Sequence, residues 1–213
     1  EHYADQVRFA KENNLKPQQH ILDAWDHYLT DDFNLLSYPE KAKQVEPLLT
    51  SQWHQNWPYN LYCPEDPAGP GGHALAGCVA TAYSQLLYYW RYPLHGTGNY
   101  CYTPWQHPEY GEQCADFENT WYRWDEMCDY PRTINTAIAE LLYQVGVALE
   151  MEFSIGGSSA RNLPEYFEAY FNISKDCEIL PRECYTDTEW KVIIMDQLDQ
   201  KFPTGYSGFD AVS

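Results

Sequence analysis

The sequence has few basic residues and no long apolar run. Of its 213 residues only 13 are Lys or Arg, against 31 Asp or Glu, so the formal net charge is -18. A surface this acidic repels phosphate backbones, and the basic clusters expected at a nucleic-acid site are missing. No run approaches the about 18 consecutive apolar residues that indicate a transmembrane helix. The sequence therefore argues against nucleic-acid binding and against a membrane span.

The usual metal-binding motifs are also missing. Neither C-x-x-C nor H-E-x-x-H occurs, so no zinc site is expected, and no motif indicates a cofactor. The first residues, EHYADQVRFAKENN, have neither the basic region nor the apolar region of a signal peptide. If such a peptide existed, it has been removed.

Cysteine is present in an odd number. The seven cysteines are Cys63, Cys78, Cys101, Cys114, Cys128, Cys177 and Cys184. Six of them would form three disulfides in an exported protein and leave one free, so we expect a secreted or cell-surface location. The alternative is a cytosolic protein with seven buried thiols. The pairing we expect is Cys101 with Cys114, Cys177 with Cys184, and Cys63 with Cys128. The first two pairs rest on the short loops that they close.

Two regions of different character make up the chain. In the first, Ile21, Leu22, Trp25 and Leu29 recur at helical spacing. A polar, broken stretch follows, and its lysines up to Lys43 offer a protease an exposed target. The second region, from about residue 44 onward, is rich in aromatic and apolar residues and predicts the main domain.

Hydrophobic spacing in the main region predicts four helices and one short strand. The helices are expected at 78–90, 133–147, 163–171 and 188–200, and the strand at 149–153. The second helix would place Ile134 on its apolar side, and Thr186 with Glu189 has the form of a capping box. The aromatic stretch 99–131 is expected to be loop.

One cysteine has the setting of a nucleophile. Cys78 follows the glycine-rich stretch GPGGHALAG and begins a predicted helix. Backbone N–H groups and the dipole at a helix N-terminus favour the thiolate, and the preceding glycines leave the sulfur reachable. From these features alone, a disulfide partner or a buried thiol is the commoner role.

The wider pattern resembles the streptopain family of papain-like cysteine peptidases. HQNWPYN, residues 54–60, and GGHALAGCVATAYSQLLYYWRYP, residues 71–93, are similar to the family's N-Q-x-x-P-Y-N-like element, its G-C-V-A-T-A and the Y-P that closes the helix. YRWDEM, AIAELLYQVGVALEMEF and GGSSA follow in the family's order. The resemblance covers roughly residues 44–213. It implies an α+β, papain-like fold with the catalytic cysteine at a helix N-terminus and the C-terminal β part largely missing from this chain.

The resemblance also implies roles for particular residues. Cys78 is the expected nucleophile, and the Gln55 side chain with the Cys78 N–H is expected to form the oxyanion hole. Without the resemblance, Gln55 would be read as a polar loop residue. The GGSSA loop is expected to line the substrate cleft, with a plain surface loop as the alternative. Its substrate-binding residues would be Gly156, Gly157, Ser158 and Ser159.

A papain-like enzyme further needs a histidine that accepts the thiol proton. In this family it lies in a G-H-A-F-like motif, and the sequence reaches only YSGFDAVS. We therefore expect a chain truncated before its catalytic histidine and inactive as a fragment. His73 is best interpreted as loop packing, His54 has no decided orientation, and none of the seven histidines is assigned as general base.

The front segment has a family interpretation as well. Residues 1–43 would be the C-terminal remnant of a propeptide and its linker, cleaved near Lys43, and the propeptide would act as an inhibitor. The peptidase domain would cover 44–213. The alternative is that 1–43 is an ordinary helical extension.

The function expected from this resemblance is that of a secreted papain-like cysteine endopeptidase, acting on protein or peptide substrates by acyl transfer. The alternative is a catalytically inactive binding or adhesion module on the same scaffold, which the missing histidine supports and the retained Cys78 and Gln55 oppose. An acyltransferase using the same cysteine chemistry is a third possibility.

Overall fold

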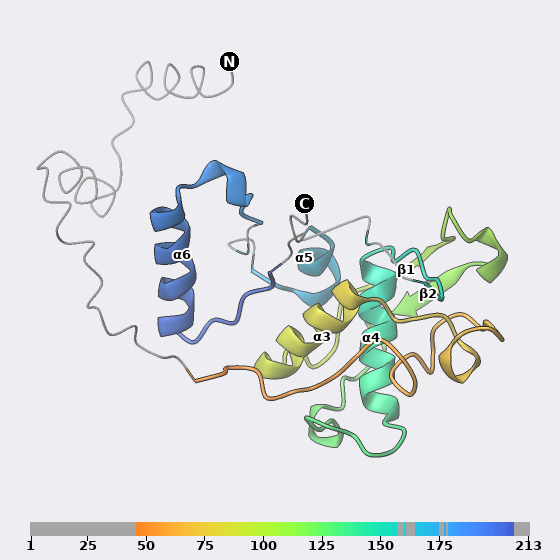
Figure 1. Ribbon diagram of the computed structural model, residues 1–213. Coiled ribbons are helices and arrows are strands. Elements are labelled where there is room, and N and C mark those ends of the chain that lie inside the picture. Colours follow the sequence, from red (N-terminus) through yellow and green to blue (C-terminus); the bar gives the residue numbers. More distant parts are fainter. Residues whose placement is uncertain (1–45, 157–159, 161–164, 175–176, 178, 207–213) are drawn as a thin grey trace, which may run out of the picture. The chain divides into compact units, whose positions relative to one another are not determined.

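The computed structural model describes residues 46–156, 160, 165–174, 177 and 179–206. The chain divides between Gln44 and Val45 into two units, and only the second contains described residues. The helix predicted around Trp25 therefore lies outside them. The described helices and strands, in chain order, are α3 (Cys78–Trp90), β1 (Asn99–Tyr102), β2 (Gln113–Asp116), α4 (Thr136–Ala148), α5 (Glu165–Phe171) and α6 (Asp187–Asp199) (Figure 1). Four short 3₁₀ turns, at Pro70–Gly72, Pro108–Tyr110, Trp124–Glu126 and Arg182–Cys184, complete them.

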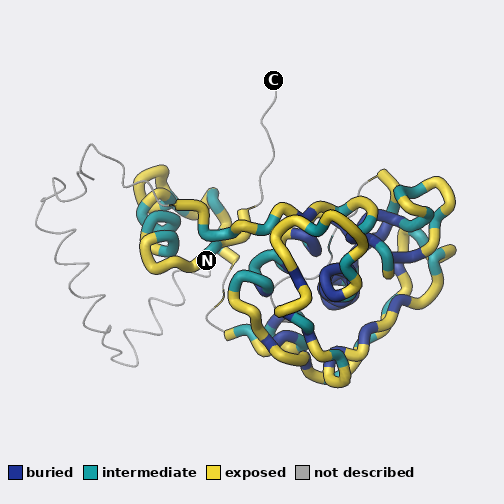
Figure 2. Tube along the Cα trace, turned by 90° about the horizontal axis from the view of Figure 1, so that it is seen from below, coloured by how far each residue is buried: buried dark blue, intermediate teal, exposed yellow. Residues whose placement is uncertain are grey.

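The core is built around α4, which contacts α3, α5 and both strands. Most of its side chains are buried, and buried segments gather inside this unit in Figure 2. The helix begins later than the sequence predicted because the Asn135 side chain accepts a hydrogen bond from the Ile138 N–H and caps it. Ile134 precedes this cap and is 51% exposed, so its expected place on the apolar side was wrong.

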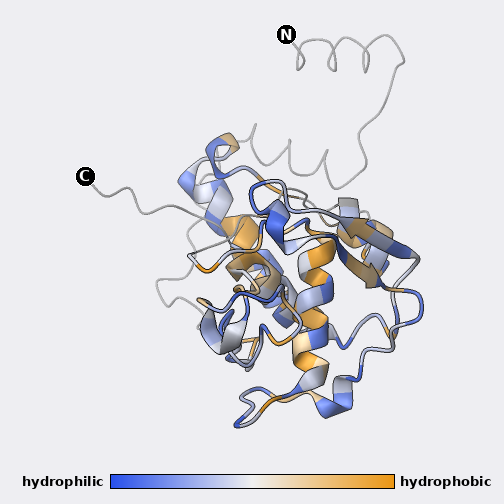
Figure 3. Cartoon of the chain, turned by 90° about the vertical axis from the view of Figure 1, so that its right-hand side faces the viewer, coloured by the Kyte–Doolittle hydropathy of each residue, from blue (hydrophilic) through white to orange (hydrophobic). Residues whose placement is uncertain are grey.

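Helix α3 has the bounds that the sequence predicted. Its buried positions are mostly small, Ala80, Thr81 and Ser84, which lets it lie close to α4. The apolar residues of both helices are orange in Figure 3. Arg91, the residue directly after the helix, has a left-handed backbone and donates its N–H back to the last turn.

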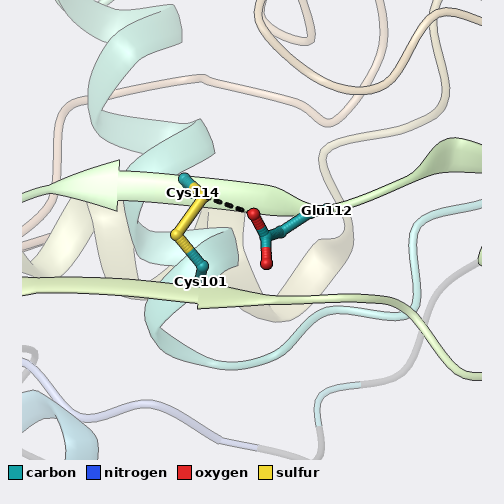
Figure 4. A group of neighbouring side chains, drawn as sticks. All are labelled: Cys101, Glu112 and Cys114. Atoms are coloured by element: carbon teal, nitrogen blue, oxygen red, sulfur yellow. Dashed lines mark hydrogen bonds between the residues drawn. A yellow bond between two sulfur atoms is a disulfide. The ribbon is translucent and has the colours of Figure 1, made fainter.

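The aromatic stretch expected to be loop contains an antiparallel hairpin of β1 and β2. Cys101 lies directly opposite Cys114 in the register, and the two form a disulfide, as predicted (Figure 4). Exposure alternates along both four-residue strands, but the residue types do not follow it, since Gln113 is buried and Cys114 exposed, which explains why the sequence did not indicate them.

The other two expected disulfides are wrong, because all four of their cysteines are free thiols. Cys63 is only 3% exposed whereas Cys128 lies at the surface. Cys184 belongs to the 3₁₀ turn Arg182–Cys184, while the Cys177 N–H closes a separate turn on Ser174. Short separation in sequence does not by itself bring two sulfurs into bonding geometry.

The strand predicted at 149–153 does not form either. Glu150 has a positive φ of 48°, and the Met151 N–H donates to Gly146 O, so the chain turns back on the end of α4. Met151, Glu152 and Phe153 are all buried in succession. The alternation of residue types therefore did not correspond to an alternation of exposure.

The last two predicted helices are present. α5 begins at Glu165, and residues 163 and 164 of its predicted range lie outside the described residues. α6 carries the predicted capping box between Thr186 and Glu189. Past α6, the Phe202 ring packs against Trp90 of α3 at 5.6 Å between centroids. Across the described part of the chain, no helix is both long and apolar enough to cross a membrane.

Candidate active site

The site begins with Cys78, the first residue of α3, whose side chain is exposed. Gly77 before it has φ 92° and ψ 143°, a conformation that side-chain-bearing residues rarely adopt. This turn leaves the Cys78 thiol exposed at the N-terminus of the helix. The Cys78 N–H belongs to the first turn, where helix geometry provides no intrahelical acceptor, so it is available to an incoming oxygen.

Gln55 lies on the loop next to the segment that leads into Cys78. Its backbone oxygen accepts a hydrogen bond from the Ala76 N–H at 3.0 Å, two residues before the cysteine. The Gln55 side chain is half-buried. The structure therefore brings the loops of both predicted catalytic residues together.

These two loops are joined at further points. The His73 Nδ1–H donates to Cys63 O at 2.8 Å, and the Ala74 N–H donates to Pro64 O at 2.8 Å. The Asn60 side chain, which sequence reasoning did not single out, is fully buried between them. The sequence feature that could have pointed to Asn60 is its place in WPYN, part of the stretch that resembles the family element. These hydrogen bonds join residues 60–64 and 70–76 into one connected group, which we call the platform.

Trp57 covers this platform two residues after Gln55. Its ring stacks on His73, with centroids 6.2 Å apart and planes 13° from parallel. A Cβ on Gly71 would lie 2.1 Å from this ring, so only glycine fits beneath it. Trp57 is 37% exposed, so part of its ring presents an apolar surface on the same loop as Gln55.

Each described histidine has a hydrogen-bond partner other than Cys78. His73 packs in the loop, as predicted, through Cys63 and Trp57. His54 accepts from the Asn56 N–H and meets the Tyr59 ring edge-on at 4.4 Å. His95 and His107 have partners in other loops, and His2, His20 and His27 lie outside the described residues.

The loop predicted to bind substrate starts beside the platform. Leu75, three residues before Cys78, donates its N–H to Ser154 O at 2.9 Å. Ile155 lies next to Gly69, because a Cβ there would be 3.1 Å from Ile155 Cγ2. Gly156 is exposed, and the structure does not describe Gly157, Ser158 or Ser159.

The remaining thiol near the platform differs sharply from Cys78. Burial raises the pKa of the Cys63 thiol far above its ordinary value, so this cysteine stays protonated and inert. In the hairpin, donor atoms of Cys101, Glu112 and Cys114 lie within 4.8 Å of one another. Their two sulfurs are joined as a disulfide, so this group offers no thiolate pair to a metal (Figure 4).

Comparison with known proteins gives consistent matches. Residues 53–212 match the Peptidase C10 family. Streptopain of Streptococcus pyogenes is 28% identical over 195 residues, which cover 81% of this chain and 48% of streptopain. The thiol protease/hemagglutinin PrtT of Porphyromonas gingivalis is 26% identical over 175 residues, or 78% of this chain and 19% of PrtT.

Two solved structures from Prevotella intermedia are similar. Active wild-type interpain A, a cysteine protease, is 35% identical with a TM-score of 0.66, over 73% of this chain and 66% of that chain. A prointerpain A fragment is 33% identical with a TM-score of 0.66, over 73% of this chain and 52% of that chain. This chain spans about half the length of the streptopain sequences that it matches.

Proposed function

Because this chain belongs to the Peptidase C10 family, we propose that it carries the nucleophile of a cysteine endopeptidase that acts on protein or peptide substrates. The likeness to interpain A confirms the predicted α+β, papain-like fold. The observation that carries the proposal is the exposed Cys78 at the N-terminus of α3, with the Gln55 loop bonded just before it.

The proposed reaction is acyl transfer. The Cys78 thiolate attacks the peptide carbonyl carbon, and the carbonyl electron pair moves onto the oxygen. The Gln55 amide and the Cys78 N–H hold this oxyanion, and each such donor is worth about 3 kcal/mol in the transition state. The amine then leaves with a proton, and water hydrolyses the thioester. The proton acceptor is a histidine outside the described residues.

Substrate is proposed to lie along the loop that begins at Ile155. The hydrogen bond from Leu75 to Ser154 sets this loop beside the segment leading to the nucleophile, which supports the assignment. The residues assigned to substrate binding are Gly156, Gly157, Ser158 and Ser159.

A zymogen organisation completes the proposal. Residues 1–43 are assigned as the remnant of an inhibitory propeptide with its linker, and 44–213 as the peptidase part. The division of the chain at Gln44 and Val45 supports this boundary. A secreted or cell-surface location is supported by the exposed Cys101–Cys114 disulfide, since such bonds persist in oxidising compartments.

The experiment is competitive labelling of the chain at pH 7.5 with a peptidyl chloromethyl ketone, read by peptide mass spectrometry. Cys128 is the internal reference, because it is also an exposed free thiol. After normalisation to labelling by iodoacetamide, Cys78 should react with the peptidyl reagent at least about tenfold faster than Cys128. A Gln55→Ala variant should reduce that preference.

Equal normalised rates at Cys78 and Cys128 would contradict the proposal. That outcome would favour the inactive binding module, since a scaffold without an oxyanion hole has no reason to prefer a peptidyl carbonyl reagent. A Cys128→Ser chain serves as the matched control and should label at Cys78 as the unmodified chain does.

A further inference from the structure

Asn60 is a fully buried polar side chain that the proposed reaction does not use. Its Nδ2 lies 2.9 Å from Pro70 O, 3.2 Å from His73 O and 3.0 Å from Ala74 O. Three backbone carbonyls thus converge on one amide nitrogen. A carbonyl buried without a donor is costly, so this amide has a specific structural task.

The position of Asn60 defines that task. It belongs to the loop that carries Gln55, whereas all three of its acceptors belong to the loop that leads into Cys78. We call the boundary where these two loops meet the seam. On this seam the Gln55 backbone oxygen also accepts a hydrogen bond from the Ala76 N–H. Any shift of one loop against the other would therefore break the Asn60 contacts and move Gln55 relative to the cysteine.

The chemistry of the amide suits this place. An NH₂ group supplies two hydrogens to neighbouring acceptors in one plane, which a hydroxyl or a carboxylate does not. The Asn60 Oδ1 is buried, and no described residue donates a hydrogen bond to it. The Asn60 Nδ2 is therefore hydrogen-bonded while its Oδ1 is not. Because an unsatisfied buried acceptor is destabilising, the contacts of Nδ2 with the three carbonyls must stabilise the fold by more than this cost.

We propose that Asn60 is a positioning residue that holds the Gln55 loop in register with the Cys78 loop and so sets the geometry of the oxyanion hole. This inference rests on the proposed function. Asn60 touches no reacting atom and acts through Gln55. Misplacing a reacting group by about 1 Å can lower a rate about a hundredfold, so a small slip of the loop is sufficient to matter.

The test separates oxyanion binding from simple thiol reactivity. A peptidyl aldehyde adds reversibly to Cys78: the Sγ–C bond forms, the carbonyl pair moves to oxygen, and the oxyanion is held by the hole or protonated by water. Iodoacetamide forms an S–C bond as iodide leaves, and no oxyanion develops. At about pH 9.5 an ordinary cysteine is thiolate without a general base, so neither reaction needs the histidine.

The measured quantity is the aldehyde concentration that halves the rate of iodoacetamide labelling at Cys78. In Asn60→Ala this concentration should rise about tenfold, while the labelling rate without aldehyde stays within about twofold. Asn56→Ala is the matched control, because Asn56 lies exposed on the same loop and its backbone makes the hydrogen bonds to His54 and Tyr59. It should behave as the unmodified chain does.

A double-mutant cycle tests whether Asn60 acts through Gln55. The Gln55→Ala/Asn60→Ala chain should lose no more than about twofold beyond Gln55→Ala alone, because the group being positioned is then gone. Asn60→Ser keeps one donor and replaces the alanine variant in both measurements if that variant does not fold.

Two failures are distinguishable. If the aldehyde does not protect Cys78 in the unmodified chain, the proposed function itself fails. If it protects the unmodified and Asn60 variant chains equally, or if the two variants are additive in the cycle, the positioning role of Asn60 is overturned while the proposed function stands.

Discussion

At the scale of single residues, the packing of the Trp57 ring on the platform depends on Gly71. Gly71 has a φ of 70°, and a Cβ there would meet the Trp57 ring. Gly72 has a φ of 83° but open space around it. Both glycines therefore have a positive φ that disfavours residues with a Cβ, but only at Gly71 would the Cβ also clash with a neighbouring side chain.

Replacing Gly71 with alanine should lower the free energy of unfolding by more than replacing Gly72. The backbone conformation alone costs about 1–2 kcal/mol for a residue with a Cβ. The displaced Trp57 ring adds to that cost only in Gly71→Ala. Urea unfolding followed by tryptophan fluorescence measures both variants, and equal midpoints would show that the ring moves aside freely.

The residues proposed to carry the chemistry were visible in the sequence to different degrees. Cys78 was marked by its glycine-rich approach and by the helix that follows it. Gln55 was marked only by the family resemblance, because a glutamine in a polar loop has no periodic or spacing signal of its own. Asn60 stood in the same quoted stretch, but its proposed role depends on three carbonyls of the following loop, which the sequence pattern does not reveal.

At the scale of elements, helix ends were predictable where a side chain caps them. The spacing of Thr186 and Glu189 predicted a capping box at the start of α6, and both reciprocal hydrogen bonds between these two residues are present. The predicted start of α4 at residue 133 was too early, because the Asn135 side chain caps the helix and Thr136 is its first residue. The stretch after α4 was misread as strand because Met151 and its neighbours are all buried against one core rather than alternately exposed.

The α6 cap gives a prediction about local stability. α6 has no fully buried residue, so its first turn depends heavily on the Thr186 side chain. Thr186→Ala should lower hydrogen-exchange protection of that turn about fivefold, which corresponds to about 1 kcal/mol. Thr188→Ala, an exposed position in the same turn, is the control and should leave protection nearly unchanged.

The same cap has a pH dependence with a definite sign. Hydrogen bonds from the Thr186 backbone N–H and then from its side chain lower the pKa of the Glu189 carboxyl. A lowered folded pKa means that the carboxylate stabilises the turn above the unfolded pKa of about 4.3 and ceases to do so as the pH falls through the folded value. Protection of the first turn, corrected for intrinsic exchange, should therefore fall on acidification below about pH 4.3. A rise there would contradict this assignment.

At the scale of the whole molecule, the division of the chain between Gln44 and Val45 bears on activation. If residues 1–43 are a propeptide, limited proteolysis should release them as a fragment and leave a stable part that begins near Gln44. N-terminal sequencing of the stable part measures this directly. Cleavage far inside the second unit, or a stable part beginning far from Gln44, would contradict the zymogen assignment.

The fold class followed from the resemblance to the streptopain family, whereas the positions of the helices followed from hydrophobic spacing along the chain. The pairing of cysteines did not, because it depends on where distant segments meet. Cys101 and Cys114 were predictable only because one short hairpin brings them opposite each other.

The seam between the Gln55 loop and the Cys78 loop also has a consequence for the order of folding. Its contacts join residues close in sequence: Cys63 and His73 are 10 positions apart, and Asn60 and Ala74 are 14 apart. Contacts of such low sequence separation close small loops and cost little chain entropy, so they form readily while a chain is still being synthesised. We therefore expect the contacts between the Gln55 loop and the Cys78 loop to form early in folding, before contacts between segments that lie further apart along the chain.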